Sequence, residues 1–322
     1  MSLAYDVIGD VHGRFDKFES LMKQLGYTRK GRHFVPPTGH QAIFVGDLID
    51  RGPEQVSVLE AVRGMVEEGF AQVVMGNHEF NAIAYTIEDP SSKSQKECLR
   101  KNRGTDWKCE QNRQQHQEFL EQVTEHSALH QFWLEWFRTL PFALDLGGFR
   151  VGHAWWDADA VAIVDRPGHR DSSGRLTDAF MIESHNDDSP LKEARKILTS
   201  GYEFKLPPGC FITDKAGHKH DNARLKIWKH EARSLRDLAI VPSGDTTSVP
   251  DLPIHEVFPN GLKPVEGSPI FIGHYWYTGD VSLDSEKVAV LDWSAANHGP
   301  LVAYRWEGEQ ALRNENFIAA MR

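Results

Sequence analysis

The residues that could do chemistry gather in three short clusters rich in glycine, aspartate and histidine. The clusters are Gly-Asp-Val-His-Gly at 9–13, Gly-Asp-Leu-Ile-Asp-Arg-Gly at 46–52 and Gly-Asn-His-Glu at 76–79, and two later Gly-His pairs end at 153 and 274. Carboxylate, amide and imidazole groups without a thiolate suit manganese, iron or zinc. A set of this size would serve two divalent ions about 3.5–4 Å apart that share a carboxylate. The candidate metal ligands are Asp10, His12, Asp47, Asn77, His153 and His274.

A short apolar run precedes each of the three clusters. The runs cover 4–8, 42–45 and 72–75. After the first cluster, apolar residues recur on one face of a helix, at Phe15, Phe18, Leu21, Met22 and Leu25. Strand, turn and helix in this order predict βαβ units and a parallel sheet. Such sheets bind their ligands outside the carboxyl ends of the strands, where the loops converge.

The spacing of the clusters along the chain favours a metal site over two simpler interpretations. A single Gly-Asp pair at a strand end is commonly a turn, and a lone Gly-His pair is commonly part of a core. Here Asp10, Asp47 and Asn77 follow one another at intervals of one strand–helix unit. Neighbouring parallel strands would carry them to a single crevice, which unrelated turns would not do. We therefore interpret the set as a metal-binding site.

These motifs, followed by the two later histidines, resemble those of the calcineurin-like metallophosphoesterases. The Asp-Arg-Gly and Gly-Asn-His-Glu forms are similar to the phosphoprotein-phosphatase branch, which also holds bacterial symmetrical diadenosine tetraphosphatases. Motifs that match the family are frequent over 3–85. The resemblance is weaker over 132–154 and 268–307, and few matches lie between these ranges. It implies an α/β fold of the αββα sandwich type.

The resemblance also implies two divalent metal ions, with manganese as our first expectation and iron or zinc as alternatives. In this arrangement, Asp47 bridges the two ions, which are otherwise held by Asp10 and His12 on one side and by Asn77, His153 and His274 on the other.

Three residues beside these ligands suit phosphoryl transfer. Arg51 can offer a bidentate fork to phosphate oxygens, although a surface arginine that only forms ion pairs is the simpler alternative. His78 is free to protonate the leaving oxygen. Asp50 resembles the carboxylate that orients this histidine in the family. A water that bridges two cations loses a proton near neutral pH, which would supply the attacking hydroxide.

Two departures from the family pattern bear on the substrate. Met75 stands where protein phosphatases of this branch have an arginine, whereas the tetraphosphatases have an apolar residue there. Trp155 and Trp156 replace small residues after the fourth ligand, either as a stacking surface or a narrowing of the cleft, or as ordinary core packing. We name Arg224, on a predicted strand, as the candidate for the missing substrate-binding cation.

The remaining sequence predicts the elements around this site. We expect a single domain over 1–322, with a polar helical excursion at 86–131 and a cap inserted at 155–265. The pattern predicts a long helix over 114–140, a hairpin over 142–153, pairing of 211–213 with 225–228, and strands at 269–274, 287–292 and 301–306.

The composition and net charge limit the classes of protein to which the chain can belong. The 322 residues are 40% hydrophobic and 25% charged, as in folded globular chains. The net charge of −10 disfavours general binding to nucleic-acid polymers. Three scattered cysteines exclude a disulfide framework and suit the cytoplasm. The sequence lacks an ordinary signal peptide and an apolar run long enough to span a bilayer, so we expect no membrane partner.

These features together predict an enzyme, a metal-dependent phosphoric ester hydrolase. By resemblance, it would hydrolyse phosphate monoesters as Ser/Thr protein phosphatases do, by attack of a hydroxide that bridges the metals. One alternative is a symmetrical dinucleoside polyphosphate hydrolase, favoured by Met75 and by aromatic residues that could stack bases. Another is a non-catalytic phosphoprotein-binding module that has kept the metals. The expected partner is a phosphorylated substrate: a phosphoprotein, a small phosphoester or a dinucleotide.

Overall fold

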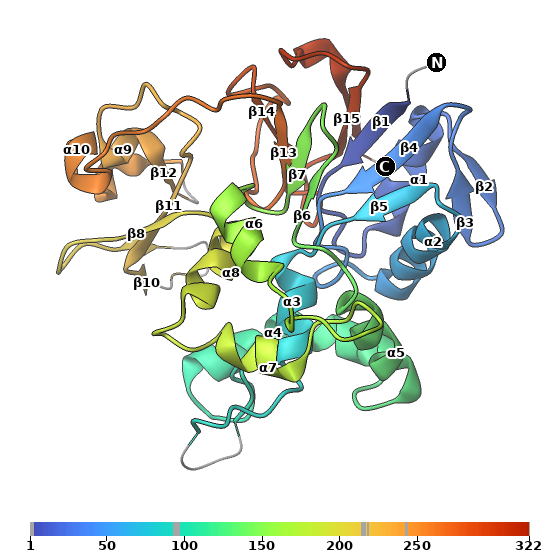
Figure 1. Ribbon diagram of the computed structural model, residues 1–322, viewed down its shortest axis with the longest axis horizontal. Helices are drawn as coiled ribbons and strands as arrows, with labels where there is room; N and C mark the ends of the chain where they lie inside the picture. The colour runs from blue at the N-terminus through green and yellow to red at the C-terminus, as the bar shows by residue number, and fades with distance from the viewer. Residues whose placement is uncertain (1–2, 93–96, 214–216, 218, 242–243, 322) are drawn as a thin grey trace.

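Two β-sheets packed face to face form the centre of the molecule, and helices lie outside both of them (Figure 1). The structure is a computed structural model, and it describes residues 3–92, 97–213, 217, 219–241 and 244–321. Across Figure 1, the layers run from α6 (Ala158–Val164) and α8 (Pro190–Ser200) through the two sheets to α1 (Phe15–Gln24) and α2 (Gln55–Glu67). The predicted α/β sandwich with αββα layers is confirmed.

The first sheet has five strands and carries the parallel unit that the sequence predicts. Its order is β16 (Phe317–Ala320), β15 (Leu301–Trp306), β1 (Ala4–Ile8), β4 (His40–Phe44) and β5 (Ala71–Val73). β1, β4 and β5 are parallel, whereas β15 is antiparallel to both β1 and β16. A hairpin of β2 (Thr28–Lys30) and β3 (His33–Val35), inserted between α1 and β4, is an addition to the predicted elements.

The second sheet contains the strands that lead to the two later histidines. Its order is β14 (Val288–Val290), β13 (Ile270–Ile272), β7 (Arg150–Gly152) and β6 (Ala143–Asp145). The first three are parallel, and β6 and β7 form the antiparallel hairpin predicted for 142–153. The strands predicted at 269–274, 287–292 and 301–306 are confirmed as β13, β14 and β15.

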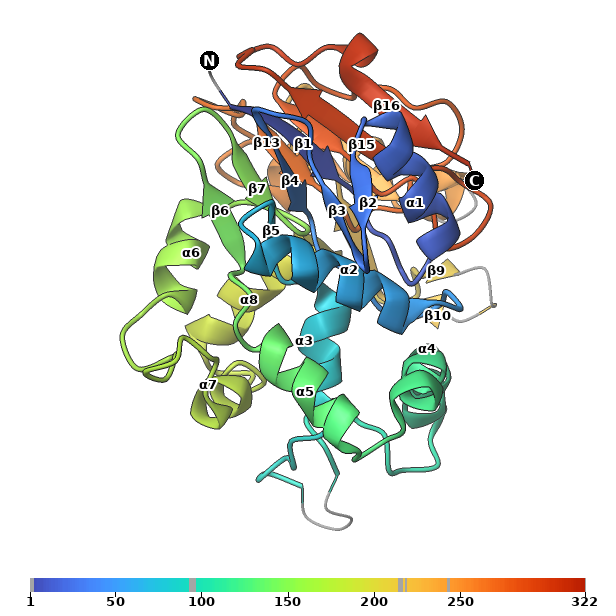
Figure 2. The ribbon, with the colours of Figure 1, turned by 90° about the vertical axis from the view of Figure 1, so that its right-hand side faces the viewer.

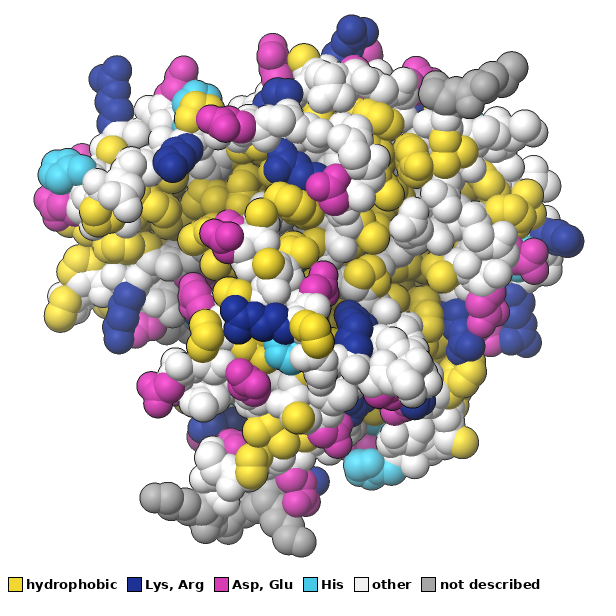
Figure 3. Space-filling view, in the orientation of Figure 1, with side chains coloured by type: hydrophobic (Ala, Val, Ile, Leu, Met, Phe, Trp, Pro, Cys, Tyr) yellow, Lys and Arg dark blue, Asp and Glu magenta, His cyan; other side chains and the backbone are white. Residues whose placement is uncertain are grey.

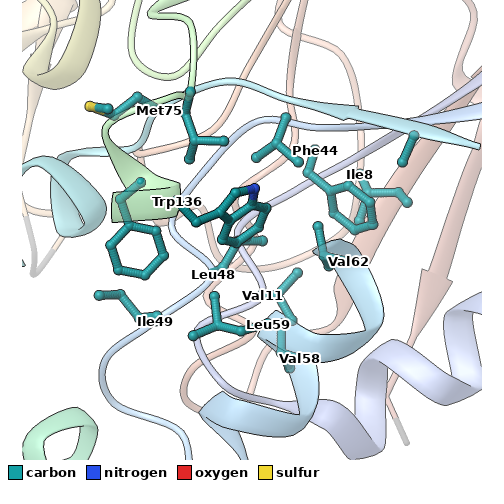
Figure 4. Close-up of a cluster of buried hydrophobic side chains, with 14 of the residues drawn as sticks. Ile8, Val11, Phe44, Leu48, Ile49, Val58, Leu59, Val62, Met75 and Trp136 are labelled. Carbon is teal, nitrogen blue, oxygen red and sulfur yellow. The ribbon is translucent and has the colours of Figure 1, made fainter. Parts of the chain in front are cut away.

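Successive residues of the central strands pack into two different cores. In β1, Val7 packs between the two sheets, and Ile8 packs on the helix side. Side chains alternate across a strand, so a strand buried on both faces is apolar at consecutive positions. Figure 4 shows the helix-side cluster, in which Ile8 and Phe44 lie beside Val62 of α2. Packing on both faces determines where each strand ends. It therefore also determines which residue stands at the edge of the sheet directly after the strand.

The long helix predicted over 114–140 is wrong, because the chain forms two helices there. α4 (Trp107–Val123) ends at Thr124, where the backbone takes a left-handed conformation with φ of 61°. α5 (Ala128–Phe137) begins after Ser127, whose side chain accepts a hydrogen bond from the backbone N–H of His130. A serine in this position is a strong helix start, so the cap overrides the continuous apolar pattern. Figure 2 shows α4 and α5 beneath α2.

Residues 155–265 form two structural parts. α6 and α8 pack against one another beside the second sheet, and α7 (Asp178–Glu183) connects them. The second part has an apolar core of its own, which includes Leu225, Leu235 and Leu238. Its elements are β8 (Glu203–Lys205), β9 (Ile212–Thr213), β10 (Lys219–His220), β11 (Asn222–Leu225), α9 (Leu235–Leu238), β12 (Ala239–Ile240) and α10 (Ile254–Val257). The predicted role of this range as a cap stays a prediction.

The pairing predicted for 211–213 with 225–228 is wrong. Thr213 pairs with Lys219, and Leu225 pairs with Ala239 of β12. β11 lies between β8 and β12, which satisfies the backbone groups on both of its edges. The turn residues 214–216 and 218 lie outside the described residues. None of the described helices is long and apolar enough to cross a membrane.

Candidate metal centre and catalytic residues

The segments after β1, β4, β5 and β13 line one cavity of about 470 Å³. The structure brings five of the six predicted ligands to this cavity wall, namely Asp10, His12, Asp47, Asn77 and His274. The sixth, His153, follows β7 and lies behind them, with Nε2 3.0 Å from Oδ1 of Asn77. The ends of strands from both sheets therefore meet at one place, as expected for ligands outside the carboxyl ends of parallel strands.

Asp47 lies at the centre of this arrangement. Its Oδ2 is 3.7 Å from Nε2 of both His12 and His78, and its Oδ1 is 3.4 Å from Nε2 of His153. Two sets of ligand atoms, each within 4.8 Å of one another, share this carboxylate: His12, Asp47 and His78 form one, and Asp47, His153 and His274 the other. A carboxylate whose two oxygens face different imidazole groups is placed as a bridging ligand would be.

His12 and His153 present their Nε2 atoms to Asp47. Nδ1 of His12 is 2.8 Å from the carbonyl oxygen of Ile49, and Nδ1 of His153 is 2.7 Å from that of Val45. Each Nδ1–H donates to its carbonyl in the neutral form, which leaves the Nε2 lone pair for a metal. Nε2 of His274 is buried and has no hydrogen-bond partner among the described residues. Burial, followed by the positive Arg51, lowers the pKa of His12, which keeps this imidazole neutral.

Asp10 lies among other buried carboxylates, and its pKa is raised although His153 acts in the opposite direction. Burial, together with the carboxylate of Asp292 and the more weakly acting Asp47, raises the pKa of Asp10 well above its ordinary value. One oxygen of Asp10 accepts a hydrogen bond from the backbone N–H of His274, whereas Oδ1 is buried without a partner among the described residues. Buried like charges and an unpartnered oxygen are what a divalent cation would neutralise. The residues present therefore fit a metal site.

Unusual backbone conformations are concentrated at this site. Seven of the nine non-glycine residues with positive φ among the described residues belong to it: His12, Asp47, Asp50, Arg51, His274, Trp276 and Ser294. Such conformations are sparsely populated and persist where the surrounding structure holds them. Two glycines allow close approach, because a Cβ at Gly76 would lie 2.2 Å from Oδ1 of Asp47, and one at Gly273 would lie 1.9 Å from Oδ1 of Asp10.

Glu79, the last residue of the Gly-Asn-His-Glu motif, positions Asp47. It lies in α3 (Asn77–Ala84) and is fully buried. Its Oε2 accepts hydrogen bonds from the backbone N–H groups of Asp47 and Gly76, at 2.9 and 3.0 Å, and its Oε1 accepts one from Leu48 at 2.8 Å. Sequence reasoning assigned this residue no role, although the motif contains it. Burial, with the Asp47 carboxylate adding to it, raises the pKa of Glu79 to about 7.

Replacing Glu79 by glutamine should weaken both the fold and the site. The amide would place N–H groups against backbone N–H groups, and leaving such buried donors unpaired costs about 1–3 kcal/mol. We also expect metal affinity to fall about 10–100-fold, as for other residues that orient ligands. Chemical denaturation and metal titration would measure the two effects. Glu67→Gln, at a side chain 60% exposed on α2, is the matched control and should change neither. Equal behaviour of the two variants would refute this role for Glu79.

His78 and Asp50, the predicted acid and its orienting carboxylate, are in direct contact. Nδ1 of His78 lies 2.5 Å from Oδ2 of Asp50. Arg51, the predicted phosphate ligand, lines the cavity and has Nη2 3.5 Å from Nε2 of His78. The three side chains therefore contact one another beside Asp47, whose Oδ2 is 3.7 Å from Nε2 of His78.

Several residues of the cavity were missed by sequence reasoning. Gln111 and Gln115 come from α4, and Trp276, Asp292, Ser294 and Asn297 come from loops after β13 and β14. Asp292 follows directly after the apolar run of β14, so the same signal of a polar residue at a strand end could have found it. α4 carries no comparable signal, because it is polar on most of its surface and has no motif.

Arg224, the predicted substrate-binding cation, reaches the cavity from β11. It lies over the indole ring of Trp276, 5.7 Å from its centroid, and 3.9 Å from a carboxylate oxygen of Glu203. Its Nε has no hydrogen-bond partner among the described residues. The guanidinium is therefore placed to contact an anion in the cavity.

The two departures from the family pattern have structural explanations. Met75 is fully buried in the helix-side core (Figure 4), so this position offers the cavity no cation. Trp155 stacks on Trp228 in a core outside the second sheet, with 5.9 Å between ring centroids. Trp156 packs under Arg150, 4.7 Å from the guanidinium. Of the two alternatives for these tryptophans, core packing is confirmed.

The chain belongs to the calcineurin-like phosphoesterase family, whose sequence profile matches residues 4–246. It is 43% identical over 88 residues to a bis(5'-nucleosyl)-tetraphosphatase PrpE [asymmetrical] of Bacillus subtilis, a match that covers 27% of this chain and 36% of the relative. The same protein of Anoxybacillus flavithermus is 43% identical over 76 residues, 24% of this chain and 31% of the relative. The matches thus span about a third of the relatives' length.

Solved structures with lower identity are also similar over most of the chain. One is a cold-active protein-tyrosine phosphatase of a psychrophilic Shewanella, at 14% identity over 99% of this chain and 81% of that one, with a TM-score of 0.47. Another is a protein serine/threonine phosphatase from Saccharomyces cerevisiae, at 16% identity over 99% of this chain and 79% of that one, with a TM-score of 0.43. The family assignment makes the chain a hydrolase, and its His/Asp cluster is compatible with divalent metals.

Proposed function

We propose that this chain is a dinuclear metal-dependent phosphoesterase that hydrolyses phosphate monoesters. The observation that carries the proposal is the position of Asp47 between two groups of imidazoles, with the His78–Asp50 pair beside it. Asp47 would hold both ions, one together with Asp10 and His12, the other together with Asn77, His153 and His274. Divalent ions in this position, manganese first and iron or zinc as alternatives, supply Lewis acidity and lower the pKa of bound water.

The chain's own residues would position the substrate and move one proton. Arg51 would bind phosphate oxygens through its guanidinium fork. The same positive group would stabilise the negative charge of the transition state. His78 would donate the proton on Nε2 to the leaving oxygen. Asp50, on Nδ1 of the same ring, would hold the imidazole in the orientation that points Nε2 at the cavity.

The first test is hydrolysis of p-nitrophenyl phosphate by metal-stripped protein, with manganese, iron, zinc or magnesium added back. Turnover that requires a divalent metal would support the proposal. Absence of turnover with every metal and with a wider panel of phosphopeptides, diesters and dinucleotides would instead support the non-catalytic phosphoprotein-binding module.

A second candidate function is hydrolysis of dinucleoside polyphosphates, and Trp276 favours it. This indole lines the cavity together with Arg224, so an aromatic surface and a cation lie beside the proposed metals. A nucleobase could stack on the ring while the guanidinium contacts its phosphates. The relatives are named as asymmetrical tetraphosphatases, whereas the sequence motifs resemble the symmetrical ones. Separating the products of diadenosine tetraphosphate by chromatography distinguishes the two modes, since only the symmetrical one gives ADP alone.

Replacing Trp276 by alanine should separate these substrates. Stacking of one base contributes about 1–3 kcal/mol, so kcat/KM for diadenosine tetraphosphate should fall about 5–150-fold. Hydrolysis of glycerol phosphate, which has no ring, should change little. Trp107→Ala, at an exposed tryptophan of α4, is the matched control. An equal loss on both substrates would exclude base stacking at Trp276.

We propose a cytoplasmic location and a phosphorylated small molecule or phosphoprotein as the partner. The three cysteines are free thiols, which suits a reducing compartment. On the face shown in Figure 3, basic and acidic side chains are interspersed. This distribution, with the net charge of −10, supports a partner other than a nucleic-acid polymer.

A further inference from the structure

His116 of α4 contacts the carboxylate that orients His78. Its Nδ1 lies 2.8 Å from Oδ1 of Asp50. Both residues are buried, with exposed fractions of 4% for His116 and 2% for Asp50. Two aromatic rings neighbour the imidazole, with centroids 5.0 Å away at Tyr85 and 5.1 Å away at Phe119. His116 therefore has one well-defined orientation, and that orientation directs it at Asp50.

The two oxygens of Asp50 are each occupied by a different imidazole. Oδ2 contacts Nδ1 of His78, and Oδ1 contacts Nδ1 of His116. Among the described residues, His116 is the one side chain that contacts Oδ1. The backbone N–H of Asp50 donates to Gln55, which holds the main chain but not the carboxylate. Without His116, the plane of the carboxylate could turn about its last side-chain bond, and His78 would lose its fixed orientation.

A histidine in this place has a simpler explanation, which is that it only fills the space between α4 and α3. Two observations go against that explanation. The Nε2 atom of His116 is buried and has no partner among the described residues, so a purely apolar side chain would satisfy the packing better. The contact with Asp50 is also charge-assisted, which makes it stronger than a neutral hydrogen bond.

We propose that His116 is a positioning residue, which holds Asp50, and through it His78, in the orientation needed to protonate the leaving group. Nδ1–H of His116 donates to Oδ1 of Asp50 throughout, and the proton that reaches the leaving oxygen comes from Nε2 of His78. This inference rests on the proposed hydrolase function. It gives α4, in the polar excursion, a role in catalysis that no motif indicated.

The test uses two variants and two substrates that differ in their leaving groups. Phenyl phosphate needs protonation of its leaving oxygen far more than p-nitrophenyl phosphate does, because phenoxide is the more basic leaving group. His116→Phe should lower kcat for phenyl phosphate about 10–100-fold, the range found for residues that orient other catalytic groups. It should lower kcat for p-nitrophenyl phosphate much less, and KM should stay constant for both. His116→Asn, whose amide can donate in place of Nδ1–H, should recover most of the loss.

A matched control is His130→Phe. His130 is also fully buried, lies in α5 and neighbours the same Phe119 ring at 6.0 Å, but its Nδ1 accepts a hydrogen bond from the backbone N–H of His126 instead of facing Asp50. It should affect the two substrates equally, if at all. The metal content of all variants should match the wild-type protein. In the metal-free protein, the downfield proton NMR signal of the His78 imidazole should shift in His116→Phe and stay in place in His130→Phe.

The outcomes separate the inference from the function on which it rests. If the wild-type protein turns over both esters and His116→Phe loses the same factor on each, or none, the positioning role is wrong and the hydrolase stands. The same holds if His116→Asn is as impaired as His116→Phe. If the wild-type protein hydrolyses neither ester with any metal, the proposed function fails, and the positioning role fails with it.

Discussion

Replacing Asp47 by asparagine should abolish metal-dependent turnover and reduce metal binding from two ions to one or none. The substitution keeps the size of the side chain and one oxygen, but it removes the negative charge that lies between His12, His78 and His153. Changes to residues that only orient a ligand cost about 10–100-fold, so we expect the loss of this shared ligand to exceed 100-fold. Metal analysis by mass spectrometry and kcat for p-nitrophenyl phosphate would measure both effects.

The control for this variant is Asp188→Asn, at an exposed carboxylate between α7 and α8. It should match the wild-type protein in metal content and in kcat. A folded Asp47→Asn protein that binds two ions and retains its activity would show that Asp47 is not the shared ligand. Burial alone would raise the pKa of the Asp47 carboxyl group. The facing imidazoles of His153 and His78 nevertheless keep its pKa well below the ordinary value.

Replacing Phe18 by alanine should lower the free energy of unfolding by about 3–5 kcal/mol, the range for truncating a buried phenylalanine. Phe18 lies on α1 and is fully buried. Its ring contacts those of Phe34 and Phe44 at centroid distances of 5.3 and 5.7 Å. The substitution removes the ring from the interface between α1 and the first sheet, and a cavity remains because the sheet cannot collapse into it.

Calorimetry or urea denaturation, with enzymatic activity followed alongside, would measure the loss. Phe132→Ala is the matched control, since this ring is 46% exposed on α5. It should cost about 1 kcal/mol or less, which is the scale of its cation–π contact with Arg63. If the two phenylalanine variants were equally stable, Phe18 would not be part of a close-packed core.

The three parallel strands and their ligands could be predicted because each is a continuous piece of sequence. The apolar run of β1 ends directly before Gly9 and Asp10, and that of β4 ends before Gly46 and Asp47. A strand buried on both faces must be apolar at consecutive positions, and the residue after it must lie at the sheet's edge. The spacing between such runs then predicts that the residues after them converge, which is why the candidate ligands could be named from the amino-acid sequence alone.

The elements that were predicted wrongly lie where two local structures compete for the same residues. The apolar pattern over 114–140 is continuous, but Ser127 can cap a helix and Thr124 can take a left-handed conformation. Whether the chain forms one helix or two depends on whether packing of α5 against α3 stabilises the fold more than continuation of α4 would. The apolar pattern likewise does not encode that Thr213 pairs with Lys219, which is nearer in the chain than 225–228.

The motifs and apolar runs were enough to predict the family, the αββα architecture that the family resemblance implies, and the residues that surround Asp47, because each motif is a continuous piece of sequence. The folded chain was needed to see that His116 reaches Asp50, that Arg224 lies over Trp276, and that Met75 packs in the helix-side core. The first two contacts join segments far apart in the chain, and neither His116 nor Trp276 belongs to a motif. Their geometry follows from how α4 and β11 pack around the sheets, and packing is a property of the whole fold.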